Sequence, residues 1–181
     1  SNNDTLTVNA DVTVDTSAAE PVELEGHTFS TSSTTITNNG TIIGTTKGIE
    51  ADQSTDFSID NSGTVSVSDS ANSPGSALSL QQSRGTVSIV NSGTLESERA
   101  DTIKLHPSTG TVTINNSGSI TSSKDRTINF GQHANAGTII NSGTISGRAN
   151  TLYIYSSGTD YSAGTITCLL YTSDAADESR G

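Results

Sequence analysis

Branched apolar residues recur along the chain in short alternating groups that are separated by polar turns. The most regular motif is Asn-Ser-Gly, which begins at Asn61, Asn91, Asn116 and Asn141. An earlier variant, Asn-Asn-Gly, begins at Asn38. The associated glycines, Gly40, Gly63, Gly93, Gly118 and Gly143, are 23, 30, 25 and 25 residues apart. A recurring period of this size indicates a repeat architecture.

Apolar residues hold fixed positions around each of these turns. Two positions before the asparagine stand Ile36, Ile59, Ile89, Ile114 and Ile139, and two positions after the glycine stand Ile42, Val65, Leu95, Ile120 and Ile145. A third group follows, with pairs two residues apart such as Ile103 and Leu105. Because alternate side chains of a strand point to opposite faces, each repeat predicts three short strands with apolar inner sides.

Three such strands cannot fold as an isolated unit, but stacked repeats bury one continuous interior. The sequence therefore predicts an all-β fold, a right-handed parallel β-helix with three short strands per coil and about six coils. Residues 1–167 form the expected solenoid, with a divergent coil over 1–34 and regular repeats over 35–167.

The Asn-Ser-Gly turns have a structural explanation. Glycine adopts a positive φ without steric cost and asparagine tolerates the left-handed region, so this pair is expected to turn the chain sharply. In a stack, each asparagine amide can also hydrogen-bond to its equivalent one coil away. We interpret the five asparagines and five glycines as a structural turn ladder.

One connection of the repeat varies in length. Between the second and third strands the apolar spacing is 7, 13, 8, 8 and 7 residues, and the long connection contains 68–75. Insertions on one face of a solenoid often carry its binding function.

The period breaks near the C-terminus. The ladder predicts an asparagine at position 168, where the chain has Cys168. The stretch 168–177 resembles the translation of a transposon-type sequencing adapter, so 168–181 are expected to be a non-native, disordered tail. The remainder contains no cysteine, which suits export through an oxidising compartment.

The amino-acid composition narrows the possible fold classes. Hydrophobic residues make up 30% of the chain, aromatic residues 4%, and serine with threonine 59 of 181 residues. This composition excludes a helical bundle and a membrane span of about 18 apolar residues. The positions of Thr111 and Thr113 are taken by Asp56 and Ser58 in one other first strand and by Ala136 and Thr138 in another, so no flat threonine array is expected.

The charge argues against nucleic acid as a partner. The chain carries a formal net charge of −11, and residues 1–60 contain one base, Lys47. Nucleic-acid binding favours a basic surface, and the acidic net charge argues against it. The acidic first coils have no oxygen-ligand loop for Ca²⁺, so no metal and no cofactor is expected.

One basic feature stands out on the variable connection. Arg99, Lys124 and Arg148 each lie four residues before the first apolar residue of a third strand, so they are expected to stack as a basic column. Such a column suits an anion, for example a sulfated or uronic-acid glycan. Asp101 and Asp125 lie close enough in register to neutralise it, which leaves an ordinary solvated face as the alternative.

The sequence favours no catalytic residue, and we expect the chain not to be an enzyme. Glycan-cleaving β-helices use clustered carboxylates, and the nearest approach here is formed by Glu96, Glu98, Asp101 and Asp125, which have basic neighbours. The three histidines, His27, His106 and His133, fall singly in connections, without a nucleophilic partner.

The runs 35–42 (TITNNGTI) and 139–147 (IINSGTISG) resemble repeats of bacterial autotransporter passenger domains, and the resemblance extends over 35–167. It implies a surface-displayed or released β-helix of a Gram-negative bacterium, secreted through a C-terminal β-barrel that this chain lacks and that is its only expected membrane attachment. The expected function is an adhesin or stalk segment, with host or environmental glycans or surface proteins as partners. The alternative is a non-catalytic fragment of a glycan-degrading β-helix enzyme.

Overall fold

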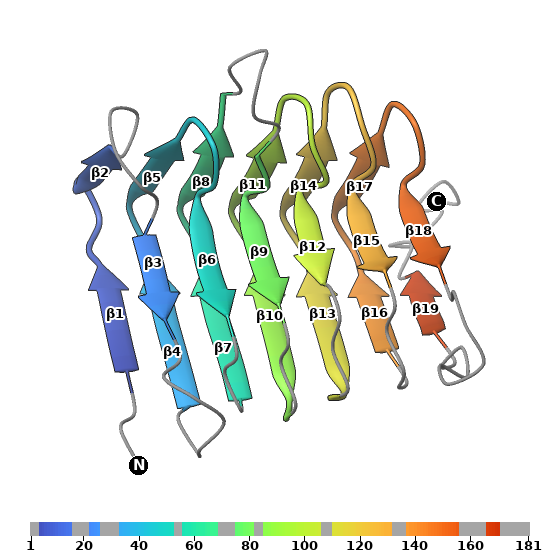
Figure 1. The fold of residues 1–181 in the computed structure, drawn as a ribbon, viewed down its shortest axis with the longest axis horizontal. Coiled ribbons are helices and arrows are strands. Elements are labelled where there is room, and N and C mark those ends of the chain that lie inside the picture. The colour runs from blue at the N-terminus through green and yellow to red at the C-terminus, as the bar shows by residue number, and fades with distance from the viewer. Residues whose placement is uncertain are drawn as a thin grey trace, which may run out of the picture.

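The computed structural model describes residues 4–15, 22–25, 33–52, 56–68, 75–81, 85–105, 110–131, 137–155 and 166–170. Every regular element among them is a β-strand, and each of six turns contributes one strand to each of three sheets, with β19 (Ile166–Leu170) as an additional strand of the first sheet (Figure 1). None of these residues belongs to a helix that could cross a membrane.

The three sheets run side by side along the stack. The first sheet contains seven strands, β1 (Asp4–Val8), β4 (Ser33–Asn38), β7 (Asp56–Asn61), β10 (Val87–Asn91), β13 (Val112–Asn116), β16 (Gly137–Asn141) and β19 (Ile166–Leu170). The second contains six, β2 (Thr13–Asp15), β5 (Thr41–Gly44), β8 (Thr64–Val67), β11 (Thr94–Ser97), β14 (Ser119–Ser122) and β17 (Thr144–Gly147). The third also contains six, β3 (Val22–Glu25), β6 (Ile49–Asp52), β9 (Leu78–Gln81), β12 (Ile103–Leu105), β15 (Ile128–Gly131) and β18 (Leu152–Tyr155).

Neighbouring strands pair in parallel, and equivalent residues of successive repeats stand opposite each other. Ile59 pairs with Ile36 on one side and with Ile89 on the other, and Leu95 lies between Val65 and Ile120. These side chains are fully buried, as are Ile103 and Leu105 of the third sheet. Because each buried branched side chain contributes roughly 1.5–3 kcal/mol, a chain of low hydrophobicity can still build a core. The predicted three-stranded parallel β-solenoid is confirmed.

The path of the chain determines the handedness of the coil. In Figure 1 the chain rises through the first sheet on the far side, descends through the third sheet on the near side and advances from left to right. This path makes the coil right-handed, as parallel crossover connections overwhelmingly are.

The asparagine ladder continues at neither end of the stack. At the N-terminal end Val8 stands opposite Asn38. At the C-terminal end β19 pairs with β16 so that Leu170 stands opposite Asn141 and Cys168 opposite Ile139. The expectation that position 168 continues the asparagine ladder is therefore wrong by two residues, a shift that leaves the alternation of faces unchanged. The expected tail boundary at 167 falls inside β19, and residues 171–181 lie outside the described part of the chain.

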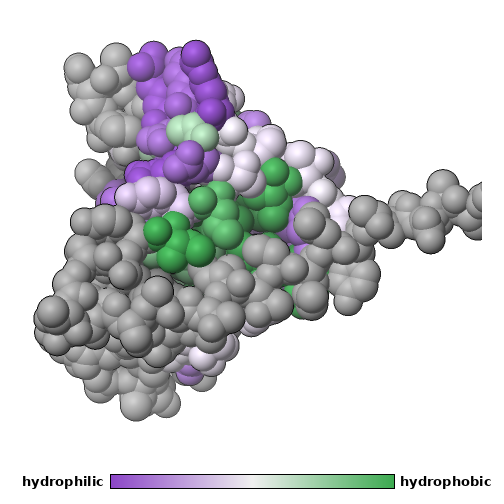
Figure 2. All heavy atoms as spheres, turned by 90° about the vertical axis from the view of Figure 1, so that its right-hand side faces the viewer, coloured by the Kyte–Doolittle hydropathy of each residue, from purple (hydrophilic) through white to green (hydrophobic). Residues whose placement is uncertain are grey.

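Figure 2 views the stack from its C-terminal end, where apolar residues gather near the centre of the cross-section. Among the described residues at this end, Ile154 is 48% exposed, whereas Ile145 and Leu152 are partly buried against the core. The apolar interior is therefore less completely covered here than in the middle of the stack.

Candidate functional site: the turn ladder and the variable connection

The asparagine side chains form a continuous hydrogen-bonded ladder. The Nδ2 atoms of Asn38, Asn61, Asn91 and Asn116 each donate to the Oδ1 atom of the next asparagine along the chain, and all four distances are 2.7 Å. Asn61 also donates to the carbonyls of Gly63 and Thr94, both at 3.2 Å. The sequence-predicted amide ladder is thus present, and every amide in it donates toward the C-terminal end.

The glycines of the same turns serve a different purpose from the one expected. None of the five turn glycines has a positive φ, and Asp11 alone among the described non-glycine residues does, with a φ of 65°. The prediction of left-handed turn residues was therefore wrong. These turns require glycine because they leave no space for a side chain: a Cβ atom on Gly93 would lie 2.0 Å from the carbonyl oxygen of Gly63. Successive turns stack backbone on backbone, so a side chain does not fit.

The ladder ends at Asn38 with an unpaired acceptor. Val8 stands opposite Asn38, and the buried Oδ1 atom of Asn38 has no hydrogen-bond partner. The first coil therefore meets the regular repeats through an apolar contact where the other turns have an amide, consistent with the expected divergence of 1–34.

The variable connection leaves and re-enters the stack without disturbing it. Val67, before the long insertion, stays in register with Ser97, and Leu78, after it, stays in register with Ile103. The returning backbone packs tightly, since a Cβ atom on Gly75 would lie 1.6 Å from the Thr46 carbonyl oxygen, and Ser97 Oγ donates to the Gly75 carbonyl at 2.7 Å. Residues 69–74 lie outside the described part of the chain.

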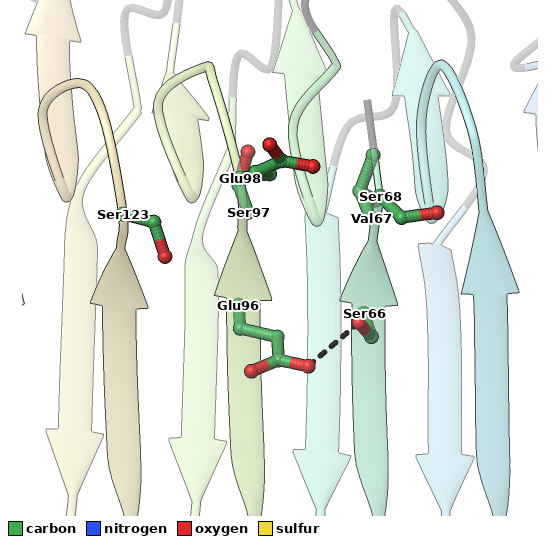
Figure 3. Close-up of a pocket in the computed structure, with 7 residues that line it drawn as sticks. All are labelled: Ser66, Val67, Ser68, Glu96, Ser97, Glu98 and Ser123. Carbon is green, nitrogen blue, oxygen red and sulfur yellow. Dashed lines mark hydrogen bonds between the residues drawn. The ribbon is translucent and has the colours of Figure 1, made fainter. Parts of the chain in front are cut away.

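Where this connection starts, an open hollow of about 190 Å³ lies on the outer side of the second sheet. Its lining residues are Ser66, Val67, Ser68, Glu96, Ser97, Glu98 and Ser123. Figure 3 shows the Glu96 carboxylate directed toward Ser66, whose Oγ donates to Glu96 Oε1 at 2.6 Å. Glu96 and Glu98 lie two residues apart on β11 and just beyond it, so both project from the same face.

The predicted basic column is interleaved with a carboxylate that the sequence interpretation had not placed there. Lys124 Nζ lies 2.6 Å from Glu98 Oε1, and Arg99 Nε lies 3.7 Å from the same oxygen. The hydrogen bond from Lys124 and then its positive charge hold the pKa of the Glu98 carboxyl below its ordinary value, with a smaller contribution from Arg99. Arg148 lies in the next connection, is exposed, and has no ion pair among the described residues. Glu98 therefore offsets part of the positive charge of the column.

Asp101, expected to neutralise this column, instead belongs to a second cluster on the outer side of the third sheet. Asp101 is 4% exposed, and its carboxylate accepts hydrogen bonds from Arg126 Nε at 2.7 Å and Asn129 Nδ2 at 2.6 Å. The Arg126 guanidinium also lies 4.4 Å above the ring of Tyr153. Asp125 lies 3.6 Å from Arg126 Nε.

Sequence reasoning had placed Asp101 close to the basic column in register and had not assigned Asn129 and Tyr153 to any site. The sequence did contain a signal for these two residues. Asn129 and Tyr153 each follow an apolar residue of a third strand, so their side chains are expected on the outer face of the third sheet. Asn129 and Tyr153 pair directly across β15 and β18.

These sites offer carboxylate, hydroxyl, amide and cationic groups for hydrogen bonding and ion pairing. Within the described ranges no group of three or more His, Cys, Asp or Glu side chains is placed to hold a metal ion. Glu98 is held in its ionised form, which does not suit a general acid. His27, His106 and His133 lie outside the described residues. No family model matches the chain, and no curated protein or solved structure matches it either.

Proposed function

We propose that this chain is a segment of a surface-exposed or secreted adhesin or stalk, in which the repeated residues build a rod and the variable connection supplies recognition. The observation that carries the proposal is that different residues build the stack and form the variable connection. The asparagines, glycines and inner apolar residues hold the stack, whereas the long insertion leaves it in register on both sides.

The outer faces support an exposed, hydrated rod. One outward column of the first sheet consists of hydroxyl residues in register, Thr5, Thr35, Ser58, Ser88, Thr113 and Thr138. The second sheet has an equivalent column, Thr13, Thr41, Thr64, Thr94, Ser119 and Thr144. All of these residues are exposed or half-buried, so each face presents hydroxyl groups at the strand spacing of about 4.8 Å.

The resemblance of the repeats to autotransporter passenger domains supports the same proposal and extends it. On this proposal the chain is displayed on, or released from, the surface of a Gram-negative bacterium. Its partners there are host or environmental glycans or surface proteins.

The proposal is tested by applying the labelled full chain to a glycan array and to an acidic polysaccharide panel. We expect saturable binding without turnover. A variant that reverses the charges of Arg99, Lys124 and Arg148 should lose binding to anionic glycans, while Lys104→Glu, on the third sheet, is the control. Undiminished binding by the triple variant would remove the basic column from the proposal.

A glycan-degrading enzyme is the second candidate, favoured by one observation: Glu96 and Glu98 line the same hollow. The ion pair between Lys124 and Glu98 weighs against it, because a general acid must be protonated. Turnover of any polysaccharide that is lost in Glu98→Gln would establish the enzyme and contradict the adhesin.

A further inference from the structure

We propose that Asn39 is a site of spontaneous covalent modification, at which its side-chain amide is lost and its link to Gly40 becomes an aspartyl or isoaspartyl bond. The site is independent of the proposed adhesive function, because it follows from the chemistry and the hydrogen bonding of one turn.

The turn at Gly40 differs from the four later turns in sequence and in hydrogen bonding. Asn39 and Gly40 form the one Asn-Gly pair of the chain, whereas the later turns have serine before the glycine. In those turns the glycine N–H donates to the carbonyl of the asparagine one turn back, as Gly93 does to Asn61 at 3.1 Å. The Gly40 N–H has no such bond to any residue that the structure describes, so its nitrogen is free to react.

The side chain of Asn39 presents the matching electrophile. Asn39 is exposed, unlike the buried asparagines of the ladder. Attack of the Gly40 nitrogen on Asn39 Cγ forms a carbon–nitrogen bond and closes a succinimide ring, and the amide leaves as ammonia with the proton of that nitrogen. Water then opens the ring at either carbonyl, which gives aspartate or isoaspartate. Ser62 Oγ donates at 2.8 Å to Asn39 Oδ1, the oxygen on which negative charge develops during the attack.

The first coil controls access to the attacking nitrogen. Gly40 is buried, and a Cβ atom on it would lie 2.4 Å from the carbonyl oxygens of both Asn9 and Val12. The attack therefore requires the first coil to move away from this turn.

Three features favour local opening at this junction. The buried Oδ1 atom of Asn38 has no hydrogen-bond partner, because Val8 stands opposite it. Asp11 has a φ of 65°, a conformation that is unfavourable for most residues with a side chain, and Val12 is 44% exposed. Opening requires less free energy where polar groups are unsatisfied and apolar contacts are few.

The modification weakens the same junction further. Isoaspartate adds a carbon atom to the backbone of a turn in which the Thr41 N–H donates to the Val12 carbonyl at 2.9 Å. The turn has no spare space on its other side either, since a Cβ atom on Gly63 would lie 1.9 Å from the Gly40 carbonyl oxygen. Contact between the first coil and the regular stack should therefore decrease as the protein ages.

The test is incubation of the full chain at mildly alkaline pH, followed by peptide mapping for a mass gain of about one dalton. The peptide TITNNGTI, residues 35–42, gives the reaction rate without the fold. We expect Asn39 to convert while the ladder asparagines stay intact. Asn39→Ser, which restores the Asn-Ser-Gly of the later turns, is the matched control and should gain no mass.

A second pair of variants tests the opening step. Val8→Asn provides a donor for Asn38 Oδ1 and should slow the reaction by roughly tenfold. Val8→Leu, which has a similar size but no donor, should not slow it. In the converted chain the Thr41 amide should exchange its hydrogen faster, whereas the Thr94 amide, which donates to the Gly63 carbonyl at 2.8 Å, should not change.

Four results would each overturn the proposal. These are an intact Asn39 under conditions that convert the peptide, conversion that is equally frequent among the ladder asparagines, an undiminished rate in Val8→Asn, and unchanged exchange at Thr41 after conversion.

Discussion

At Asn91 a single side chain links three turns of the stack. Its Oδ1 atom accepts from Asn61 and its Nδ2 atom donates to Asn116, and the residue is fully buried. An amide that is bonded on both sides meets its hydrogen-bonding requirement inside an apolar coil, where an unpaired polar group costs about 1–3 kcal/mol. The identity of this residue is therefore dictated by its neighbours on both sides.

Replacing Asn91 with leucine removes the donor to Asn116 Oδ1 and the acceptor of Asn61 Nδ2 together. We expect Asn91→Leu to lower the free energy of unfolding by about 2–4 kcal/mol, measured by urea denaturation. Asn115→Leu, the same change at an exposed position in the next turn, is the control and should stay within about 0.5 kcal/mol. Equal losses in both variants would contradict a stabilising role for the ladder.

The second residue-scale prediction concerns protonation of Glu98. Because its pKa is lowered by Lys124, the ion pair stabilises the fold above the ordinary Glu pKa of 4.5 and is lost as the pH falls through the lowered value. Carboxyl titration by NMR should place the Glu98 midpoint below 4.5. Lys124→Gln should raise that midpoint toward the ordinary value, whereas Lys104→Gln should leave it in place.

Strands of the third sheet show how an outer face is held by contacts between turns. Asp101 precedes β12, Arg126 precedes β15 and Tyr153 lies in β18, so one arginine joins three successive turns. The guanidinium directs two N–H groups toward the Asp101 carboxylate, and its flat face lies over the Tyr153 ring. A lysine ammonium group has neither the paired N–H geometry nor the flat face.

At this scale we expect Arg126→Lys to cost about 1–2 kcal/mol in the free energy of unfolding, although the charge is kept. Arg148→Lys makes the same exchange at an exposed position and should have no measurable effect. A double-mutant cycle between Arg126→Lys and Tyr153→Leu isolates the stacking contribution. Additive effects in that cycle would show that the stacking contact contributes nothing.

For the whole molecule, the architecture was predictable because its residues repeat. The spacing of Ile59, Asn61 and Val65 recurs in each regular turn, and this periodicity predicts both the strands and the amide ladder. The reason for the glycines was not predictable, since the approach of Gly93 to the Gly63 carbonyl depends on backbone positions in two turns.

The charged sites were less predictable than the fold. Glu98 and Lys124 are 26 residues apart, and the side chains of exposed residues choose among several partners at similar distance. The register of the third strands predicted that Asp101 lies close to the basic column but gave no indication that Glu98 would reach Lys124.

The apolar C-terminal end of the described stack predicts self-association. Ile154 is 48% exposed on β18, which is the last strand of its sheet, so apolar surface and an unpaired strand edge lie together. We expect Ile154→Ser to reduce concentration-dependent association in analytical ultracentrifugation. Val90→Ser, at a 40% exposed position on the interior strand β10, should leave association unchanged. Association that is equal in both variants would point to another surface.

The long connection between β8 and β9 has a consequence for how such a protein can change. The stack tolerates a 13-residue apolar spacing beside spacings of seven and eight, because the pitch is set by Val67, Gly75 and Leu78 rather than by the segment between them. That segment is therefore a natural insertion point, where new sequence can be acquired by evolution, or grafted by design, and displayed from the rod at no cost to its register.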